Sequence, residues 1–217
     1  DVLKAVFVMF CGDDAEHAGA IELWHNDPKE SREMTLDDGY YGTTADAFEF
    51  MSRRTGFHKG IGLPGMTWEA GAPVFLPDLG KSGRFLRADS AIKVGINRGF
   101  AFPVANQGDN HYVLAFLSAL ATPLVQRLEV WSPAGSDGAL YLSEGFCETQ
   151  GLLQASTDAA IAPGQGVVGR AFATAVPMVT ERAADEPGPV GATGWTSVAA
   201  LPVLRQGRVT AVVAWYF

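Results

Sequence analysis

The chain contains an internal repeat, and this feature restricts its fold more than any other. Residues 21–24 read Ile-Glu-Leu-Trp and residues 128–131 read Leu-Glu-Val-Trp, an offset of 107 residues. Four further blocks match in the same order, and the offset shrinks to 99 only between blocks, as loop deletions would produce. Self-similarity of this kind indicates one structural unit used twice. The sequence therefore predicts two domains, residues 1–121 and 122–217.

Glycines recur at matched positions of the two copies. Gly60-x-Gly62-x-x-Gly65 returns as Gly164-x-Gly166-x-x-Gly169. After a strand and before a helix, this spacing is typical of a pyrophosphate-binding turn. Residues 56–59 do not read as an apolar strand, however, so that context is missing. The recurrence predicts instead a structural turn that lets a helix pack closely on a sheet.

Each copy reads as a mixture of strands and short helices. Residues with high β-propensity predict strands in the first copy at 20–24, 34–41, 74–76, 100–105 and 112–117. Apolar residues at helical spacing predict a helix around 47–51, and Pro64 with Gly71 marks the start and end of a second. A third helix is predicted between Asp89 as its N-cap and Gly95. The second copy is expected to repeat this order with a shorter middle.

One strand occurs more often than the repeat requires. Residues 6–10 match residues 113–117, and residues 211–217 are of the same type, which makes three strands for two units. Either the first of them is left over from a preceding repeat, or the units exchange strands at their junction. The sequence leaves both alternatives open.

Charge and composition exclude several classes of partner. The net charge of −8 would repel phosphate backbones and anionic lipid surfaces, so neither nucleic acid nor membrane is expected as a partner. The most apolar stretch, residues 112–125, is shorter than the ~20 residues of a membrane-spanning helix. The two cysteines, Cys11 and Cys147, form neither a disulfide framework nor a CxxC pair, which favours a cytoplasmic protein.

A longer pattern in the first copy points to a family. Residues 62–78 combine a Leu-Pro-Gly turn, Trp68, a Gly-x-Pro-Val segment and Asp78, and a small-Pro-Val strand follows at 101–104. This pattern resembles GAF domains over residues 20–118. It is also similar to the GAF-like sensor region of plant NIN-like proteins and bacterial nitrate receptors. The resemblance is weaker in the second copy, where Arg182 aligns with Asp78.

The resemblance implies the fold class and a place for a ligand. The expected class is α/β in the α+β sense: two GAF-like units, each a central, mostly antiparallel sheet with helices packed on it. GAF domains hold small ligands between the sheet and the helices. The Asn-Lys-x-x-x-Phe-Asp-Glu signature of cyclic-nucleotide-binding members and the chromophore-attachment Cys-His of phytochromes are both missing here.

The candidate ligand-binding residues follow from that resemblance. In the first copy they are Trp68, Asp78, Phe85, Arg87 and Phe100. Aromatic side chains with one arginine suit a small planar or anionic ligand, because the guanidinium presents a fork of donors. Buried aromatic residues mostly pack in cores, however, so each of these residues taken alone is better explained as ordinary core, with the arginine solvated. The counterparts in the second copy are Phe172, Met178, Arg182 and Trp195.

Signs of catalysis or of a metal site are sparse. The sequence has no HExxH, no metal-type Cys/His spacing and no GxSxG motif. The free methionine-sulfoxide reductases are GAF-type enzymes that rely on neighbouring cysteines, whereas Cys11 and Cys147 occupy non-matching positions of different copies.

The leading hypothesis is a tandem sensory or regulatory module that binds a small molecule in its first copy and has no catalytic activity of its own. Its ligand is unidentified, with a small anion as one candidate, and no cofactor is implied. It would act on an output domain or partner protein, or through a homodimer. The alternatives are a structural or dimerisation pair that binds no ligand, and a thiol methionine-sulfoxide reductase.

Overall fold

The computed structural model describes residues 19–42, 44, 46–81, 83, 85–107, 109–119, 122–187 and 194–217. They divide into two compact units, of which the first ends at Leu124 and the second runs from Val125 to Phe217. The strand expected at residues 6–10 and Cys11 lie outside the described residues. Within the described part of the chain, no helix is both long enough and apolar enough to cross a membrane.

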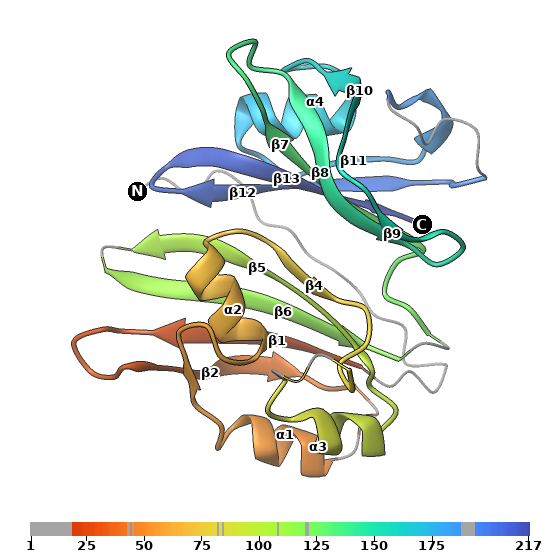
Figure 1. Ribbon diagram of the computed structural model, residues 1–217. Coiled ribbons are helices and arrows are strands. Elements are labelled where there is room, and N and C mark those ends of the chain that lie inside the picture. The colour runs from red at the N-terminus through yellow and green to blue at the C-terminus, as the bar shows by residue number, and fades with distance from the viewer. Residues whose placement is uncertain are drawn as a thin grey trace. The chain divides into compact units, whose positions relative to one another are not determined.

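The first unit is built on one antiparallel sheet. Its described strands follow the order β3-β2-β1-β6-β5-β4 across the sheet (Figure 1). The bounds are β1 Gly19–Asn26, β2 Glu33–Tyr40, β3 Phe57–His58, β4 Val74–Leu76, β5 Arg98–Gln107 and β6 Asn110–Ser118. In β1 every second side chain is buried, which is the alternation that a strand with one face on a core requires.

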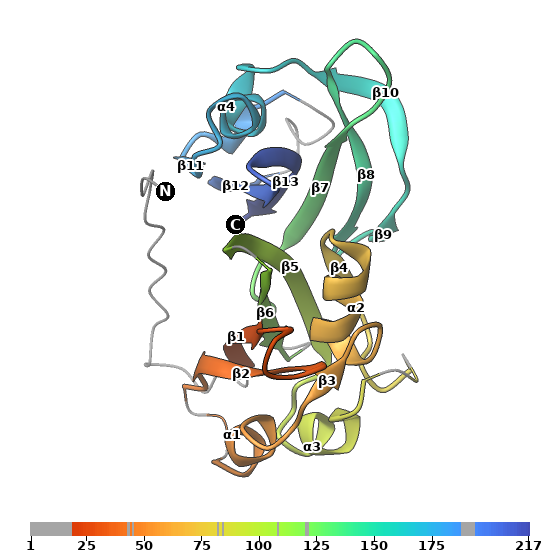
Figure 2. The ribbon, with the colours of Figure 1, turned by 90° about the vertical axis from the view of Figure 1, so that its left-hand side faces the viewer.

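Three short helices belong to this unit: α1 Asp46–Ser52, α2 Gly62–Ala70 and α3 Ala88–Lys93. Helix α2 crosses one face of the sheet and contacts β5 and β6, and α1 and α3 lie side by side (Figures 1 and 2). As expected, Gly71 ends α2, with a left-handed φ of 60° and its N–H donated to the Thr67 carbonyl. Asp89 lies in the first turn of α3, and the N-cap position belongs to Arg87.

The second unit repeats the sheet of the first. Its described strands follow the order β10-β8-β7-β13-β12-β11, with β9 paired to β8. The six strands of that path match the order β3-β2-β1-β6-β5-β4 of the first unit, position by position. The predicted fold class, two α+β units with antiparallel sheets, is therefore confirmed. The bounds are β7 Arg127–Pro133, β8 Leu140–Cys147, β9 Gly151–Leu153, β10 Ser156–Ile161, α4 Gly166–Thr174, β11 Met178–Thr180, a 3-10 turn Ala183–Asp185, β12 Val198–Arg205 and β13 Arg208–Tyr216.

The expectation that the second copy repeats every element is wrong at two places in the described residues. Where the first unit has α3, the described part of the second has only the 3-10 turn Ala183–Asp185. Strand β10 precedes the second glycine motif and takes the sheet position of β3, but where the first unit has α1 the second has β9. Residues 154–160 contain no apolar side chain larger than alanine, so a helix there would have no face to bury. Strand β3, two residues long and just before the first glycine motif, was not predicted.

The glycine motif forms the same turn in both units. The N–H of Gly60 donates to the carbonyl of Gly65 at 2.8 Å, and Gly164 donates to Gly169 at the same distance. A Cβ at Gly65 or at Gly169 would lie 2.1 or 2.2 Å from the carbonyl oxygen seven residues earlier. The third glycine of each motif is thus required by close approach of the helix to the preceding backbone.

Candidate ligand site

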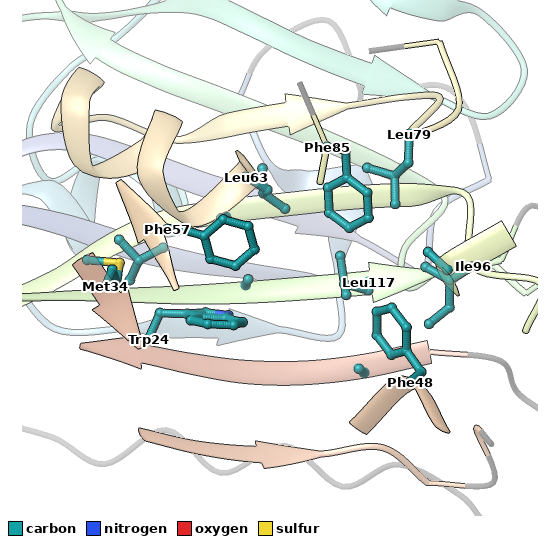
Figure 3. Close-up of a cluster of buried hydrophobic side chains, with 14 of the residues drawn as sticks. Trp24, Met34, Phe48, Phe57, Leu63, Leu79, Phe85, Ile96 and Leu117 are labelled. Carbon is teal, nitrogen blue, oxygen red and sulfur yellow. The ribbon is translucent and has the colours of Figure 1, made fainter. Parts of the chain in front are cut away.

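The core of the first unit lies between the sheet and its helices. Figure 3 shows Trp24 on β1, with the ring of Phe57 above it and Phe48 and Phe85 farther along the same layer. The Trp24 and Phe57 rings meet edge to face, with centroids 4.8 Å apart. This is the space in which the GAF resemblance would place a ligand.

A carboxylate points into this core. Side chains alternate along a strand, so Glu22 shares the core-facing side of β1 with Ala20 and Trp24, and it is 0% exposed. Its cross-strand neighbours are small, Gly39 on β2 and Ala115 on β6. A β-bulge in the β1–β2 pairing falls next to Trp24. Small neighbours on both sides leave room above the sheet for the groups that contact the carboxylate.

Three neutral donors from different elements hold the Glu22 carboxylate. Trp24 Nε1 donates to Oε2 at 3.0 Å, while the Tyr41 hydroxyl and Ser52 Oγ donate to Oε1 at 3.0 and 2.9 Å. Ser52 reaches it because it lies one helical turn after Phe48 on the buried face of α1. Burial raises the pKa of Glu22, but the charge and hydrogen bonds of Arg87, with those of Ser52 and Trp24, lower it further than burial raises it. The carboxyl group is therefore ionised despite its burial.

The cation is Arg87, which stands at the turn before α3. Its Nη1 and Nη2 donate to Glu22 Oε1 and Oε2 at 2.6 and 2.8 Å, a bidentate ion pair. Nη1 also donates to Ser52 Oγ. The Arg87 side chain is 2% exposed, and its Nε is buried without a hydrogen-bond partner. Both terminal nitrogens of Arg87 thus have hydrogen-bond acceptors, whereas its Nε has none among the described residues.

Four aromatic rings surround the guanidinium. The distances from Cζ to the ring centroids are 4.9 Å for Phe48, 5.1 Å for Trp24 and 5.5 Å for both Phe57 and Phe85. Aromatic faces carry partial negative charge, so rings at this range attract a cation. We call the carboxylate and these rings the Glu22 cage: Glu22, Trp24, Phe48, Phe57 and Phe85.

The second unit carries the same buried acid. Glu129 is 0% exposed and has Gly145 and Ala214 as cross-strand neighbours. Trp131 Nε1 and the Tyr216 hydroxyl donate to its Oε2 at 2.9 and 2.7 Å. A bulge in the β7–β8 pairing again falls next to the tryptophan. The repeated Glu-x-Trp sequence is therefore one structural device, a core carboxylate held by the tryptophan two residues later.

The two units differ in where the cation originates. Arg127 donates from Nε to Glu129 Oε1 at 2.7 Å and is the first residue of β7, opposite Cys147 and Tyr216 of the neighbouring strands. Arg87 comes from outside the sheet, 65 residues from its partner. In the second unit the cation therefore belongs to a strand of the sheet, whereas in the first unit it belongs to the connection between β4 and α3.

The structure brings together two of the five candidate residues, Phe85 and Arg87. Phe100 faces the other side of the sheet, because its cross-strand partner is Phe116, whereas the neighbouring Ala101 belongs to the core. The Phe100 ring lies 5.7 Å from that of Phe102. Phe100 therefore does not share a face with the Glu22 cage.

Trp68 and Asp78 lie elsewhere in the first unit. Trp68 is half-buried on α2, with its ring 5.5 Å from that of His111 and 5.8 Å from Lys59 Nζ. The Asp78 side chain is 42% exposed, and its hydrogen bond to Lys81 lowers its pKa. The second-unit counterparts divide similarly: Arg182 is exposed and pairs with Asp185, whereas the apolar ones pack against the core, Phe172, Met178 and Trp195.

Sequence reasoning missed Glu22 and Glu129. The signal was present, because a glutamate recurs at the same point of both copies, two residues before a tryptophan and in phase with the buried face of its strand. An acid in phase with core residues requires partners inside the protein.

Other reactive groups are few. The described residues contain no cluster of three or more His, Cys, Asp or Glu side chains able to hold a metal ion. Cys147 is buried and lies 3.3 Å from Thr149 Oγ1. Burial raises the pKa of this thiol, but hydrogen bonds from Thr149 and Gln150 lower it by more.

Comparison with known proteins gives structural relatives only. No family model matches the sequence, and no curated protein does. The free methionine-R-sulfoxide reductase from Neisseria meningitidis, solved with its substrate, is 18% identical over 46% of this chain and 51% of its own, with a TM-score of 0.35. The alignment thus spans about half of that enzyme.

Two further solved structures are similar. NreA from Staphylococcus aureus, mutated in its nitrate binding site, is 15% identical over 50% of this chain and 78% of its own, with a TM-score of 0.38. The GAF domain of a phosphoenolpyruvate-protein phosphotransferase from Coxiella burnetii is 18% identical over 46% of this chain and 55% of its own, with a TM-score of 0.35. The structures similar to this chain therefore include GAF domains and GAF-like proteins.

Proposed function

We propose that the chain is a tandem GAF-type regulatory module, with domains at residues 1–121 and 122–217, whose first domain binds a small molecule at the Glu22 cage. The observation that supports it is an ionised Glu22–Arg87 pair enclosed by aromatic rings. Binding would be relayed to an output domain, a partner protein or a second copy of the chain.

The energetics of the ion pair favour a functional role for this site. Removing two charges from water costs several kcal/mol per ion, and apolar residues of similar volume are often as stable or more so. Arg87 also leaves its Nε unpaired in the core, which costs about 1–3 kcal/mol. The buried pair of the second unit uses all three nitrogens of Arg127, whereas that of the first unit leaves one unpaired. This difference favours the first unit as the place where another cation could replace the arginine.

The charge balance argues against a small anion as the ligand. Both terminal nitrogens of Arg87 already donate to the Glu22 carboxylate, so the charge of the guanidinium is neutralised before an anion arrives. That carboxylate is anchored on β1 by its own backbone and cannot retreat without distorting the central strand pair. An anion beside it would be repelled at short range in a medium of low dielectric constant.

The second domain fits the alternative of a structural unit. Its Arg127 lies in the sheet two residues from Glu129, and its side chain also donates to Gln150, so the cation belongs to the strand itself. We propose that ligand binding belongs to the first domain and that the second serves assembly or contact with a partner.

We also propose that the chain has no catalytic activity of its own. In the described residues, the free thiol is Cys147, which is 1% exposed on β8. A thiolate that attacks a substrate must be accessible to it. If Cys147→Ser abolished reduction of free methionine sulfoxide by this chain, the proposal would be overturned in favour of a thiol reductase.

Thermal unfolding of the full chain tests ligand binding. Candidate ligands are nitrate, nucleotides, amino acids, tetrapyrroles and amidines. A ligand at a hundred times its Kd should stabilise the domain that binds it by about 2.7 kcal/mol, and hydrogen exchange should locate the added protection in the first domain. The variant Glu22→Gln/Arg87→Met should lose the response, whereas Glu49→Gln, which removes an exposed charge, should keep it. No shift with any compound would contradict the proposal.

A further inference from the structure

The Glu22 cage has the composition of a cation receptor. Its polar floor is one ionised carboxylate, and its walls are the faces and edges of four aromatic rings. Carboxylate and aromatic surfaces both attract cations, and no positively charged group of the described residues faces the carboxylate except Arg87. Arg87 therefore occupies the position that a cationic ligand would take.

Arg87 is not the only group that holds the carboxylate. Trp24, Tyr41 and Ser52 each donate a hydrogen bond to it, and none of the three carries a positive charge. If Arg87 left, these donors would continue to hold the carboxylate in place. Burial raises the pKa of Glu22, so a cation that enters would restore the charged form that Arg87 now stabilises.

Arg87 is an imperfect occupant. Its Nε–H lies in the core without an acceptor, since both carboxylate oxygens receive the two terminal nitrogens. An amidinium offers the same planar pair of NH2 groups and has carbon in place of that third nitrogen. A ligand of this kind would make the two hydrogen bonds without burying an unpaired donor.

The two units differ in where their buried cation is attached. Arg127 lies within β7 and is paired to strands on both sides. Arg87 lies at a turn before α3, outside the sheet, so its side chain can withdraw without breaking a hydrogen bond between strands. The internal repeat thus holds one cation within the sheet and one on a connection outside it.

We infer that the Glu22 cage binds a small organic cation with a planar amidinium or guanidinium head, and that Arg87 is an internal competitor for this site. The inference rests on the proposed function, because it names the ligand class of the same site. Release of Arg87 on binding would alter the turn before α3, which gives the ligand a means of changing the surface of the first domain.

Emptying the cage tests this directly. In the full chain, Arg87→Ala removes the internal cation, and calorimetry then measures the binding of methylguanidinium, acetamidinium and neutral methylurea. We expect saturable binding of both cations at millimolar concentrations, too dilute for denaturation by guanidinium, and no binding of methylurea. Glu22→Gln in the same background should weaken cation binding by about tenfold or more. The unmodified chain should bind the same cations more weakly, because Arg87 competes.

Controls keep the outcome interpretable. Arg53→Ala removes an exposed arginine paired with Glu49 and should create no binding of methylguanidinium. If Arg87→Ala does not fold alone, recovery of its circular dichroism by methylguanidinium but not methylurea supports the inference, and recovery by neither overturns it. Binding of the cations unchanged by Glu22→Gln also overturns it.

The test separates this inference from the proposed function. A nitrate, nucleotide or tetrapyrrole that protects the first domain, with no cation binding to Arg87→Ala, would leave a ligand-binding module whose ligand class differs from the one inferred. Cation binding to Arg87→Ala together with no ligand response of the unmodified chain would show a cage that Arg87 never vacates, and would contradict the regulatory role.

Discussion

Replacing Glu22 by glutamine should destabilise the first unit by about 3–5 kcal/mol, because the Arg87 guanidinium would remain buried without a counter-charge. The two side chains are 0% and 2% exposed, so solvent does not screen the loss. Since small domains are stable by only about 5–15 kcal/mol, this change removes a large part of the total.

Urea unfolding of the full chain, followed by circular dichroism, measures this loss, and hydrogen exchange assigns it to the first unit. The matched control is Glu49→Gln, which removes the same charge from the exposed pair with Arg53 and should cost less than about 0.5 kcal/mol. Adding Arg87→Met to Glu22→Gln should recover most of the loss, because no uncompensated charge then remains. A cost for Glu22→Gln no larger than that of the control would refute the reasoning.

Three further outcomes are expected. Acidification should destabilise the first unit as the pH falls below about 4.5, the pKa of Glu22 in the unfolded chain, and on through the lower pKa of Glu22 in the folded unit. The reason is that the unfolded state binds the proton first. In Glu22→Gln this part of the pH dependence of urea unfolding should vanish. In urea unfolding, Gly145→Ala should lower the free energy of unfolding by about 3 kcal/mol and Gly39→Ala by about 1 kcal/mol. A Cβ at Gly145 would meet a backbone oxygen at 2.5 Å, whereas one at Gly39 would meet the side chain of Tyr41, which can move. Equal costs would contradict this difference. Trp68→Ala should lower the free energy of unfolding by about 2 kcal/mol, less than the ~3–5 kcal/mol of a fully buried tryptophan. The response to ligands should remain, since Trp68 contributes no ring to the Glu22 cage. Loss of that response in thermal unfolding would place the site nearer α2.

The sheet and its repetition were predictable because they depend on local pattern. Alternating apolar residues and turn glycines mark strands and helix ends within a few residues, and β4 has the predicted bounds, Val74–Leu76. β3 is two residues long and carries too little pattern to be recognised. The replacement of α1 by β9 was missed because similarity of the flanking blocks was extended over residues that lack a helical apolar face.

The candidate site was only partly predictable, because its central contact is non-local. Phe85 and Arg87 are two residues apart, and their proximity follows from sequence. The partner of Arg87 is 65 residues away on β1, and no spacing rule identifies it. Phe100 was placed with them by analogy, yet alternation along β5 turns its side chain to the opposite face of the sheet.

Hydrogen exchange of the unmodified full chain, with and without each candidate ligand, tests the central claim most directly. Regulation through the Glu22 cage predicts that at least one compound slows exchange in β1 and α1, and that Glu22→Gln/Arg87→Met abolishes this protection. Exchange that no compound changes, or protection confined to the second unit, would contradict the account.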